Sequence, residues 1–261
     1  MTSASLGLGT YRIHSLALSD AVIRAAADPT SAWIDTAPNY LNGQAQSLLA
    51  PALAQHRIPD STKIGFLTDR AARDAVLDGT LTTGAAERGH CLSSPYVHWQ
   101  CSRNRTELGR DHLDLVFAHN SEQTDGDPYE ALRDAFTALE AEAAAGALST
   151  YGVATWDGFD TGTLNVPALH RLATEVAGTE HHHLRAIQLP VSLVTATAFT
   201  RPWTKEARSP RPPTSDGRST PQHPCSAGNF PTWPPPNSPH SSTPASPSPR
   251  HASSPRPPAQ E

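Results

Sequence analysis

Four side chains of this sequence form a set that could transfer a proton to a carbonyl group: Asp35, Tyr40, Lys63 and His119. A tyrosine, with an ordinary pKa of about 10, is a weak acid at neutral pH. A nearby ammonium group favours the phenolate and lowers that pKa, and a carboxylate holds the ammonium charged and oriented. A histidine can orient the carbonyl or share the proton. The set predicts protonation of a developing alkoxide while hydride arrives from a carrier.

The usage of lysine draws attention to Lys63. The chain has only two lysines, and the other, Lys205, lies among the last 61 residues. Every other basic position of residues 1–200 is an arginine, which cannot titrate in the physiological range. The count favours a need for a titratable amine at position 63, and chance retention in an arginine-rich composition explains it equally well.

Short apolar runs alternate with amphipathic segments through residues 1–200, which predicts a parallel sheet covered by helices. The predicted strands are Leu6–Tyr11, Ala32–Thr36, Lys63–Leu67, Leu113–Ala118, Tyr151–Thr155 and Ala186–Leu193. The predicted helices are Leu18–Ala27, Asn42–Gln55, Tyr96–Leu108, Tyr129–Ala145 and Val166–Val176. Asp35, Tyr40 and His119 come at the ends of predicted strands, the edge where active sites form, while Lys63 begins the third predicted strand.

Two architectures fit alternating strands and helices: a doubly wound open sheet and a (β/α)8 barrel. The dinucleotide-binding form of the open sheet has G-x-G-x-x-G after its first strand. Here Gly7 and Gly9 lie inside the first apolar run, and no third glycine follows in register. We therefore predict an α/β fold of the (β/α)8 TIM-barrel type, incomplete, with about six of its eight strands.

The last 61 residues differ sharply from the rest in composition. They hold seventeen of the 25 prolines and contain no Ile, Leu, Val, Met or Tyr. Such a segment buries too little apolar surface to offset its ordering entropy. We predict a barrel-like domain over residues 1–200 and a disordered Pro/Ser/Arg-rich tail over 201–261. The abrupt change also suggests an out-of-frame translation of DNA that once encoded the last units of the barrel.

Charge and cysteine content bear on partners and location. The net charge is −5, and the tail is basic, so residues 1–200 are acidic, which argues against nucleic acid as a partner. Three cysteines without metal-ligand spacing suit a reducing compartment. We find no signal peptide, no membrane-spanning apolar run and no convincing metal site, since the run His181–His183 reads as a solvated loop. These features predict a cytoplasmic protein of unassigned oligomeric state.

Motifs in a fixed order over about 190 residues resemble the aldo-keto reductase family. They are Leu6-Gly7-Leu8-Gly9-Thr10, Asp35-Thr36-Ala37 with Tyr40, Lys63, Asp114 to Asn120, Tyr151 to Trp156, and Ile187-Gln188-Leu189-Pro190. The resemblance implies NADPH-dependent reduction of an aldehyde or ketone. It makes Tyr40 the general acid, Lys63 and Asp35 its activating pair, and His119 the residue that orients the carbonyl. It places Thr10, Asp35, Thr155 and Gln188 around the nicotinamide and its ribose.

Two departures from the family pattern leave the function open. Ala154-Thr155 stands where the family usually has Ser-Asn, so one hydrogen bond to the carboxamide is lost. The family's last two strands, with their phosphate-binding loop, have no counterpart in this sequence. This indicates a C-terminally truncated or frameshifted member of the family. Three interpretations remain: a reductase of small carbonyl compounds with NADP(H) binding impaired or compensated, a redox-inactive acid-base enzyme, and a non-catalytic remnant.

Overall fold

The structure, a computed structural model, describes residues 6–11, 22, 24, 28 and 31–191. The predicted helix Leu18–Ala27, the domain boundary at residue 200 and the predicted tail lie outside the described residues, apart from Val22 and Arg24. The elements along the chain are β1 (Leu6–Gly9), β2 (Ser31–Asp35), η1 (Tyr40–Gly43), α2 (Ala45–Gln55), β3 (Asp60–Ile64), α3 (Asp69–Leu77), α4 (Thr83–Glu87), α5 (Ser94–Leu108), β4 (Leu113–His119), η2 (Ser121–Gln123), α6 (Pro128–Ala144), β5 (Leu148–Ala154), α7 (Val166–Ala177) and β6 (Leu184–Gln188).

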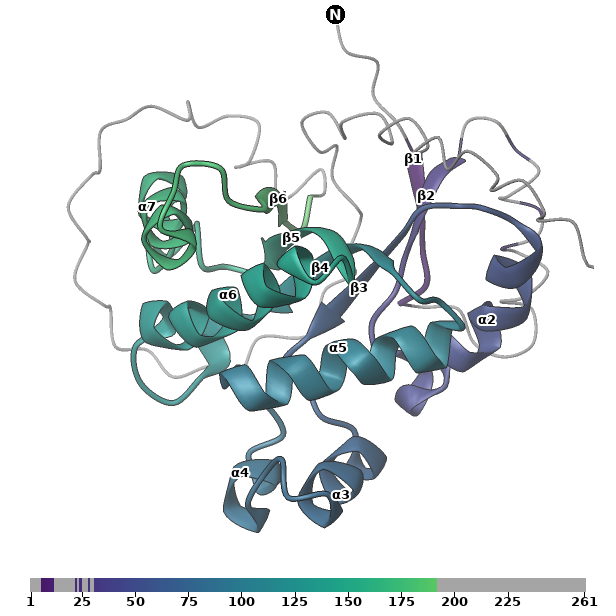
Figure 1. The fold of residues 1–261 in the computed structure, drawn as a ribbon, viewed down its shortest axis with the longest axis horizontal. Helices are drawn as coiled ribbons and strands as arrows, with labels where there is room; N and C mark the ends of the chain where they lie inside the picture. The colour runs from purple at the N-terminus through teal and green to yellow at the C-terminus, as the bar shows by residue number, and fades with distance from the viewer. Residues whose placement is uncertain (1–5, 12–21, 23, 25–27, 29–30, 192–261) are drawn as a thin grey trace, which may run out of the picture.

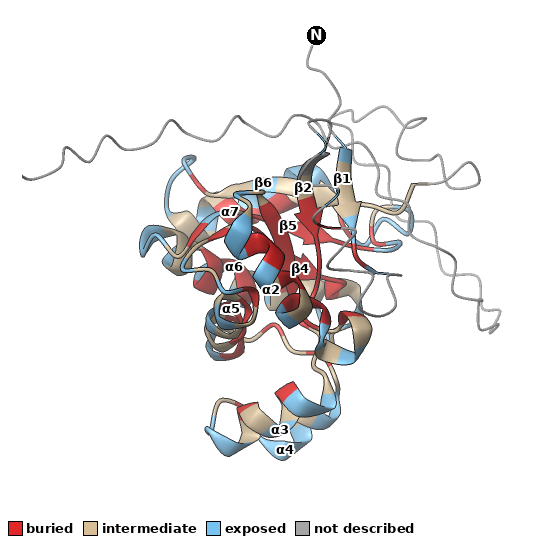
Figure 2. Ribbon diagram, turned by 90° about the vertical axis from the view of Figure 1, so that its right-hand side faces the viewer, coloured by how far each residue is buried: buried red, intermediate tan, exposed pale blue. Residues whose placement is uncertain are grey.

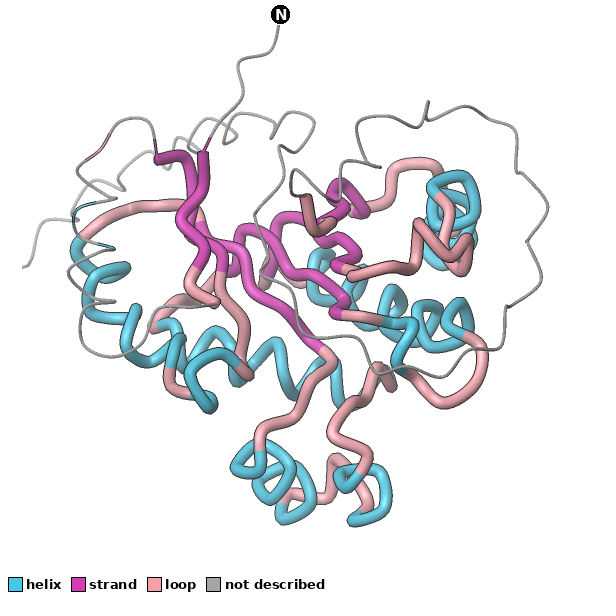
Figure 3. Tube along the Cα trace, turned by 180° about the vertical axis from the view of Figure 1, so that it is seen from behind, coloured by secondary structure: helices cyan, strands magenta, loops and turns pink. Residues whose placement is uncertain are grey.

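Six parallel strands form one curled sheet in the order β1-β2-β3-β4-β5-β6. Each strand pairs with the next one along the chain, whereas a doubly wound sheet reverses its strand order. The sheet is thus an incomplete barrel, as the sequence predicts. Helices α2, α5, α6 and α7 lie along its outer side, while α3 and α4 lie apart from the sheet, beyond α5 (Figures 1 and 3).

The core lies mainly between the sheet and these helices, where Figure 2 shows buried residues on β4, β5 and the inner sides of the helices. Alternate residues of β4 face opposite sides. Val116 and Ala118 join the large cluster under the helices, while Leu115 and Phe117 form a small interior cluster with Ala154 and Ala186. The inner face therefore carries few apolar side chains and has room for the polar residues described below.

Helix α6 illustrates how the local sequence sets the elements. Asp127 accepts a hydrogen bond from Tyr129 N, and Pro128 occupies the first turn, where its missing N–H costs nothing. Leu132, Phe136 and Leu139 recur at helical spacing and are fully buried. The predicted helix over 129–145 is confirmed within one residue at each end.

The predicted strand Lys63–Leu67 is wrong in its position, because β3 runs from Asp60 to Ile64. The polar run Asp60-Ser61-Thr62 looks like a turn in the sequence, yet all three residues are buried. The side chains of Ser61 and Thr62 find hydrogen-bond partners on β2 and α2. Lys63 consequently lies near the carboxyl end of its strand, on the edge where the other chemical residues gather, and not at the start of a strand.

Other predictions of elements need correction. The fifth strand begins at Leu148, three residues before the predicted Tyr151. The sixth strand is Leu184–Gln188 and begins two residues before the predicted Ala186–Leu193. The segment predicted as a helix from Asn42 begins with the short helix η1, and α2 itself starts at Ala45. Helices α3 and α4 are absent from the prediction. They begin at the threonine caps Thr68 and Thr82, whose hydroxyl oxygens accept N–H groups three residues on.

Candidate active site

A buried ion pair joins the ends of β2 and β3. Lys63 Nζ lies 3.0 Å and 2.9 Å from the two carboxylate oxygens of Asp35, and it also donates to the Thr36 carbonyl at 2.9 Å. Lys63 is only 1% exposed and Asp35 8%. Burial lowers the pKa of the Lys63 ammonium, but the Asp35 carboxylate and the Tyr40 phenol raise it by more. The pKa of Lys63 therefore lies above its ordinary value and the amine stays charged.

Tyr40 lies directly beside this ion pair. Lys63 Nζ is 5.0 Å from the centroid of its ring, and a hydrogen bond to the phenol contributes to the raised pKa of Lys63. The loop after Tyr40 holds two residues, Leu41 (φ 51°) and Asn42 (φ 54°), in the left-handed region, which leucine rarely adopts. The ring of Tyr11, on the loop after β1, packs edge-on against the ring of Tyr40, and the two ring centroids are 5.0 Å apart.

His119 is the last residue of β4, two residues beyond Phe117 and on the same inner face. Burial lowers the pKa of His119 well below its ordinary range, and the charge of Lys63 lowers it further. The ring is therefore neutral at neutral pH. Its Nδ1 is buried without a partner among the described residues, which leaves Nε2 as the nitrogen able to meet a ligand.

Two further residues support this set, and sequence reasoning did not assign them to it. Ser61 donates its hydroxyl to Asp35 Oδ1 at 2.8 Å, so that carboxylate accepts from two buried side chains. His90 donates its Nε2–H to the His119 carbonyl at 2.7 Å, because a carbonyl can only accept. Ser61 could have been found, since residues two apart on a strand share a face with Lys63. His90 carries no such signal.

The predicted cofactor-binding side chains differ in the hydrogen bonds that they already make within the protein. The Thr10 hydroxyl donates to the Asp35 carbonyl at 3.0 Å. The Thr155 hydroxyl donates to Glu122 at 2.6 Å and accepts from Gly158 N at 2.9 Å. The half-buried Gln188, at the end of β6, makes no side-chain hydrogen bond within the part of the chain that the structure describes. Of these side chains, Gln188 is the one that has no hydrogen-bond partner among the described residues.

Gly65 gives the site a testable steric constraint, because its φ is +126° and an added Cβ would lie 2.7 Å from His90 Nε2 and 3.2 Å from the His119 carbonyl oxygen. We expect Gly65→Ala to lower the free energy of unfolding by roughly 3 kcal/mol, measured by urea denaturation. Gly89→Ala is the matched control, since Gly89 also has a positive φ but has open space around it. Equal losses in the two variants would contradict this packing argument.

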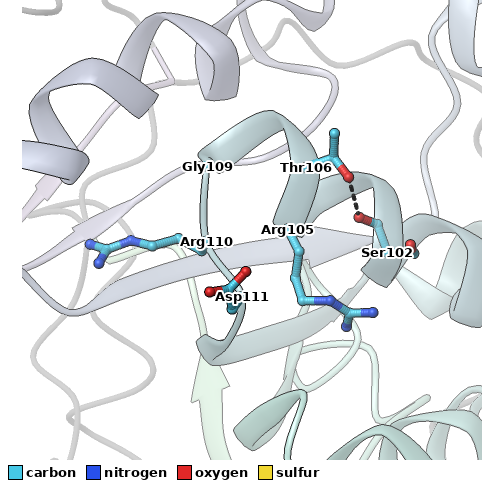
Figure 4. Close-up of a pocket in the computed structure, with 6 residues that line it drawn as sticks. All are labelled: Ser102, Arg105, Thr106, Gly109, Arg110 and Asp111. Atoms are coloured by element: carbon cyan, nitrogen blue, oxygen red, sulfur yellow. Dashed lines mark hydrogen bonds between the residues drawn. The ribbon is translucent and has the colours of Figure 1, made fainter. Parts of the chain in front are cut away.

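A hollow of the described surface lies elsewhere. It has a volume of about 330 Å³ and is lined by residues at the end of α5 and the following loop: Ser102, Arg105, Thr106, Gly109, Arg110 and Asp111 (Figure 4). That loop leads into the first residue of β4, whereas His119 is its last. Arg105 and Arg110 point in different directions (Figure 4). The hollow is therefore separate from the candidate active site.

The described residues contain no group of three His, Cys, Asp or Glu side chains that could hold a metal ion. The prediction of a solvated loop at His181–His183 is wrong for His182, which is 3% exposed and packs edge-on against His170. His183 Nδ1 contacts Glu140 at 2.6 Å. Within the same described ranges no helix has the length and apolar character needed to cross a membrane.

Comparison with known proteins identifies the class. The model of the Aldo/keto reductase family matches residues 5–163, which include Asp35, Tyr40, Lys63 and His119. The chain belongs to the aldo-keto reductase family, a family of oxidoreductases, as its sequence motifs predict. A comparison with curated protein sequences finds no match.

Solved structures of aldo-keto reductases show partial similarity. One from a Medee basin deep-sea metagenome library shares 21% identity with a TM-score of 0.48, over 71% of this chain and 53% of its own. One from Bacillus halodurans, in its holo form, shares 18% with a TM-score of 0.45, over 58% of this chain and 46% of its own. A Pseudomonas aeruginosa protein shares 21% with a TM-score of 0.46, over 70% and 71%. The chain thus spans about half the length of the first two proteins.

Proposed function

We propose that this chain is an NAD(P)H-dependent oxidoreductase that reduces an aldehyde or a ketone to an alcohol. The observation that carries the proposal is the buried Lys63–Asp35 ion pair against the Tyr40 ring, at the carboxyl edge of a parallel sheet. A charged, buried ammonium beside a phenol stabilises the phenolate and so makes the phenol a better acid. Reduction of a carbonyl needs such an acid where the alkoxide forms.

Each residue of the set has a distinct task in this proposal. Tyr40 donates its proton to the carbonyl oxygen as that oxygen gains negative charge, and Lys63 stabilises the phenolate left behind. Neutral His119, protonated on Nε2, donates a hydrogen bond that orients the carbonyl. Asp35, held by the hydroxyl of Ser61, keeps the ammonium charged and in place.

The residues present fit a nicotinamide in part. The amide of Gln188, which bonds to no described residue, can hold the carboxamide, and Asp35 and Thr10 lie on neighbouring strand ends at the same edge. A bound reduced nicotinamide would supply the hydride. The Thr155 hydroxyl already bonds to Glu122 and Gly158, so it would have to exchange a partner to take the role that the family pattern implies.

Titration with NADPH, followed by its fluorescence, tests the proposal directly. We expect saturable binding, and NADPH oxidation when para-nitrobenzaldehyde is added as a probe carbonyl. Titration with NADH in parallel distinguishes the two cofactors. If neither nucleotide binds saturably, the reductase proposal is wrong.

The commitment of Thr155 favours one alternative, an acid-base enzyme that uses Tyr40 and Lys63 without a nicotinamide, for example in dehydration or isomerisation. Such an enzyme needs the same activated phenol but no cradle for the carboxamide. Catalysis that persists without nucleotide and disappears in Tyr40→Phe would favour this alternative over reduction.

A further inference from the structure

Within the described part of the chain, the backbone at Lys63 has no paired strand on one side. Strand β3 pairs with β2 only at Asp60 and Ser61, and the Ser61 carbonyl accepts from Thr36 N at 2.9 Å. In a parallel ladder, the backbone groups of residues two apart point toward the same neighbouring strand. The Lys63 carbonyl therefore faces the side on which β2 has already ended. A buried carbonyl in that position needs another partner.

Asn104 of α5 supplies that partner. Its Nδ2 donates to the Lys63 carbonyl at 3.0 Å, and Asn104 is completely buried. Gln46 of α2 sets the orientation of the amide by donating to Asn104 Oδ1 at 3.1 Å. Gln46 in turn accepts from the hydroxyl of Thr62 at 2.6 Å. Three buried side chains thus tie α2, α5 and the end of β3 together.

A second amide on the same face of α5 continues this arrangement. Gln100, four residues before Asn104, accepts from Gly65 N at 2.8 Å and donates to the Phe66 carbonyl at 3.0 Å. The ring of Phe66 packs edge-on against that of His119 with centroids 4.9 Å apart. Asn104 and Gln100, one turn apart on α5, therefore hold the backbone at the active-site lysine and just beyond it.

We propose that Asn104 is a positioning residue, which holds the end of β3 so that Lys63 Nζ stays against Asp35 and Tyr40. It contacts neither substrate nor cofactor in this role, and the inference rests on the function proposed above for Tyr40 and Lys63. Burying a polar amide costs free energy unless the amide forms hydrogen bonds. Here the Asn104 amide donates to the backbone carbonyl of Lys63 itself. Without Asn104 the carbonyl is left unpaired and β3 is free to shift.

The test uses the full chain and two apolar variants, Asn104→Ala and Asn104→Leu, of which one is small and the other close to asparagine in size. Asn104→Ser is the rescue variant, because its hydroxyl can still donate to the Lys63 carbonyl. Asn165→Ala is the control, since Asn165 is exposed and its side chain accepts from Ala168 N to cap α7, far along the chain. The Tyr40 phenol is titrated by the absorbance of tyrosinate, with the Tyr40→Phe form of each protein subtracted.

We expect the apolar variants to raise the apparent pKa of Tyr40 by about one unit, the serine variant to move it back, and Asn165→Ala to leave it unchanged. The pH profile of reduction should shift by the same amount, with kcat lowered about tenfold and KM little changed. A folded apolar variant with an unmoved Tyr40 titration would overturn the proposal. The absorbance titration needs neither nucleotide nor substrate, so its result is separate from a failure of NADPH binding.

Discussion

Tyr40→Phe is expected to lower kcat for the reduction of para-nitrobenzaldehyde by about a thousandfold, because it removes the proton that the alkoxide must receive. The ring and its packing beside Lys63 remain, so the fold and the binding of NADPH should be little affected. The measurement is steady-state oxidation of NADPH, with binding followed separately by fluorescence.

Tyr11→Phe provides the matched control for this variant. Tyr11 touches the ring of Tyr40 but is 41% exposed, and the ion pair of Lys63 with Asp35 does not involve it. Removing its hydroxyl should leave kcat close to that of the parent. A Tyr40→Phe protein that retains most of its kcat would exclude the phenol as the proton donor and with it the proposed mechanism.

Asp60→Asn is expected to stabilise the protein, and by more as the pH rises toward 8. Asp60 lies at the opposite end of β3 from Lys63 and is 2% exposed. Both oxygens of its carboxyl group are buried, and neither accepts a hydrogen bond from the described residues. Burial, with the nearby charge of Asp114, raises its pKa from 3.8 to about 8. Asparagine has the same shape and bears no charge to bury.

The direction with pH follows from the raised pKa. Below its unfolded pKa of 3.8, Asp60 is protonated in both states and does not affect stability. As the pH rises from there toward 8, the unfolded chain releases a proton that the folded protein retains, so the parent loses stability, by up to about 1.4 kcal/mol per pH unit. Urea denaturation should show a gain for Asp60→Asn on the order of 3 kcal/mol near neutral pH and little gain in acid.

Asp127→Asn is the control for this second variant, since Asp127 caps α6 at the surface and asparagine caps a helix equally well. It should leave both the stability and its pH dependence almost unchanged. If the parent and Asp60→Asn lose stability with pH along the same slope, Asp60 is ionised in the folded protein and this account of it is wrong.

Local sequence determined the order of the elements and the identity of the chemical residues. The helical spacing of buried residues such as Leu132 and Phe136 can be read from residues close together in the sequence. The same holds for the polar residues that follow each apolar run. The motifs in fixed order from Leu6 to Pro190 were sufficient to infer the family, and the alternation of strands and helices was sufficient to infer the parallel barrel. Alternating strands and helices place the strand ends on one edge whatever the details of packing.

Only the tertiary structure decided which backbone and side-chain groups hold the lysine in place. The bonds of Ser61 to Asp35, Asn104 to Lys63, and Gln46 to Glu107 join residues 26, 41 and 61 positions apart, and no local pattern reports them. The same long-range bonds explain why the polar run before Lys63 forms a strand and not a turn. A polar residue reads as exposed from sequence, because its buried partner becomes visible only when distant elements pack together.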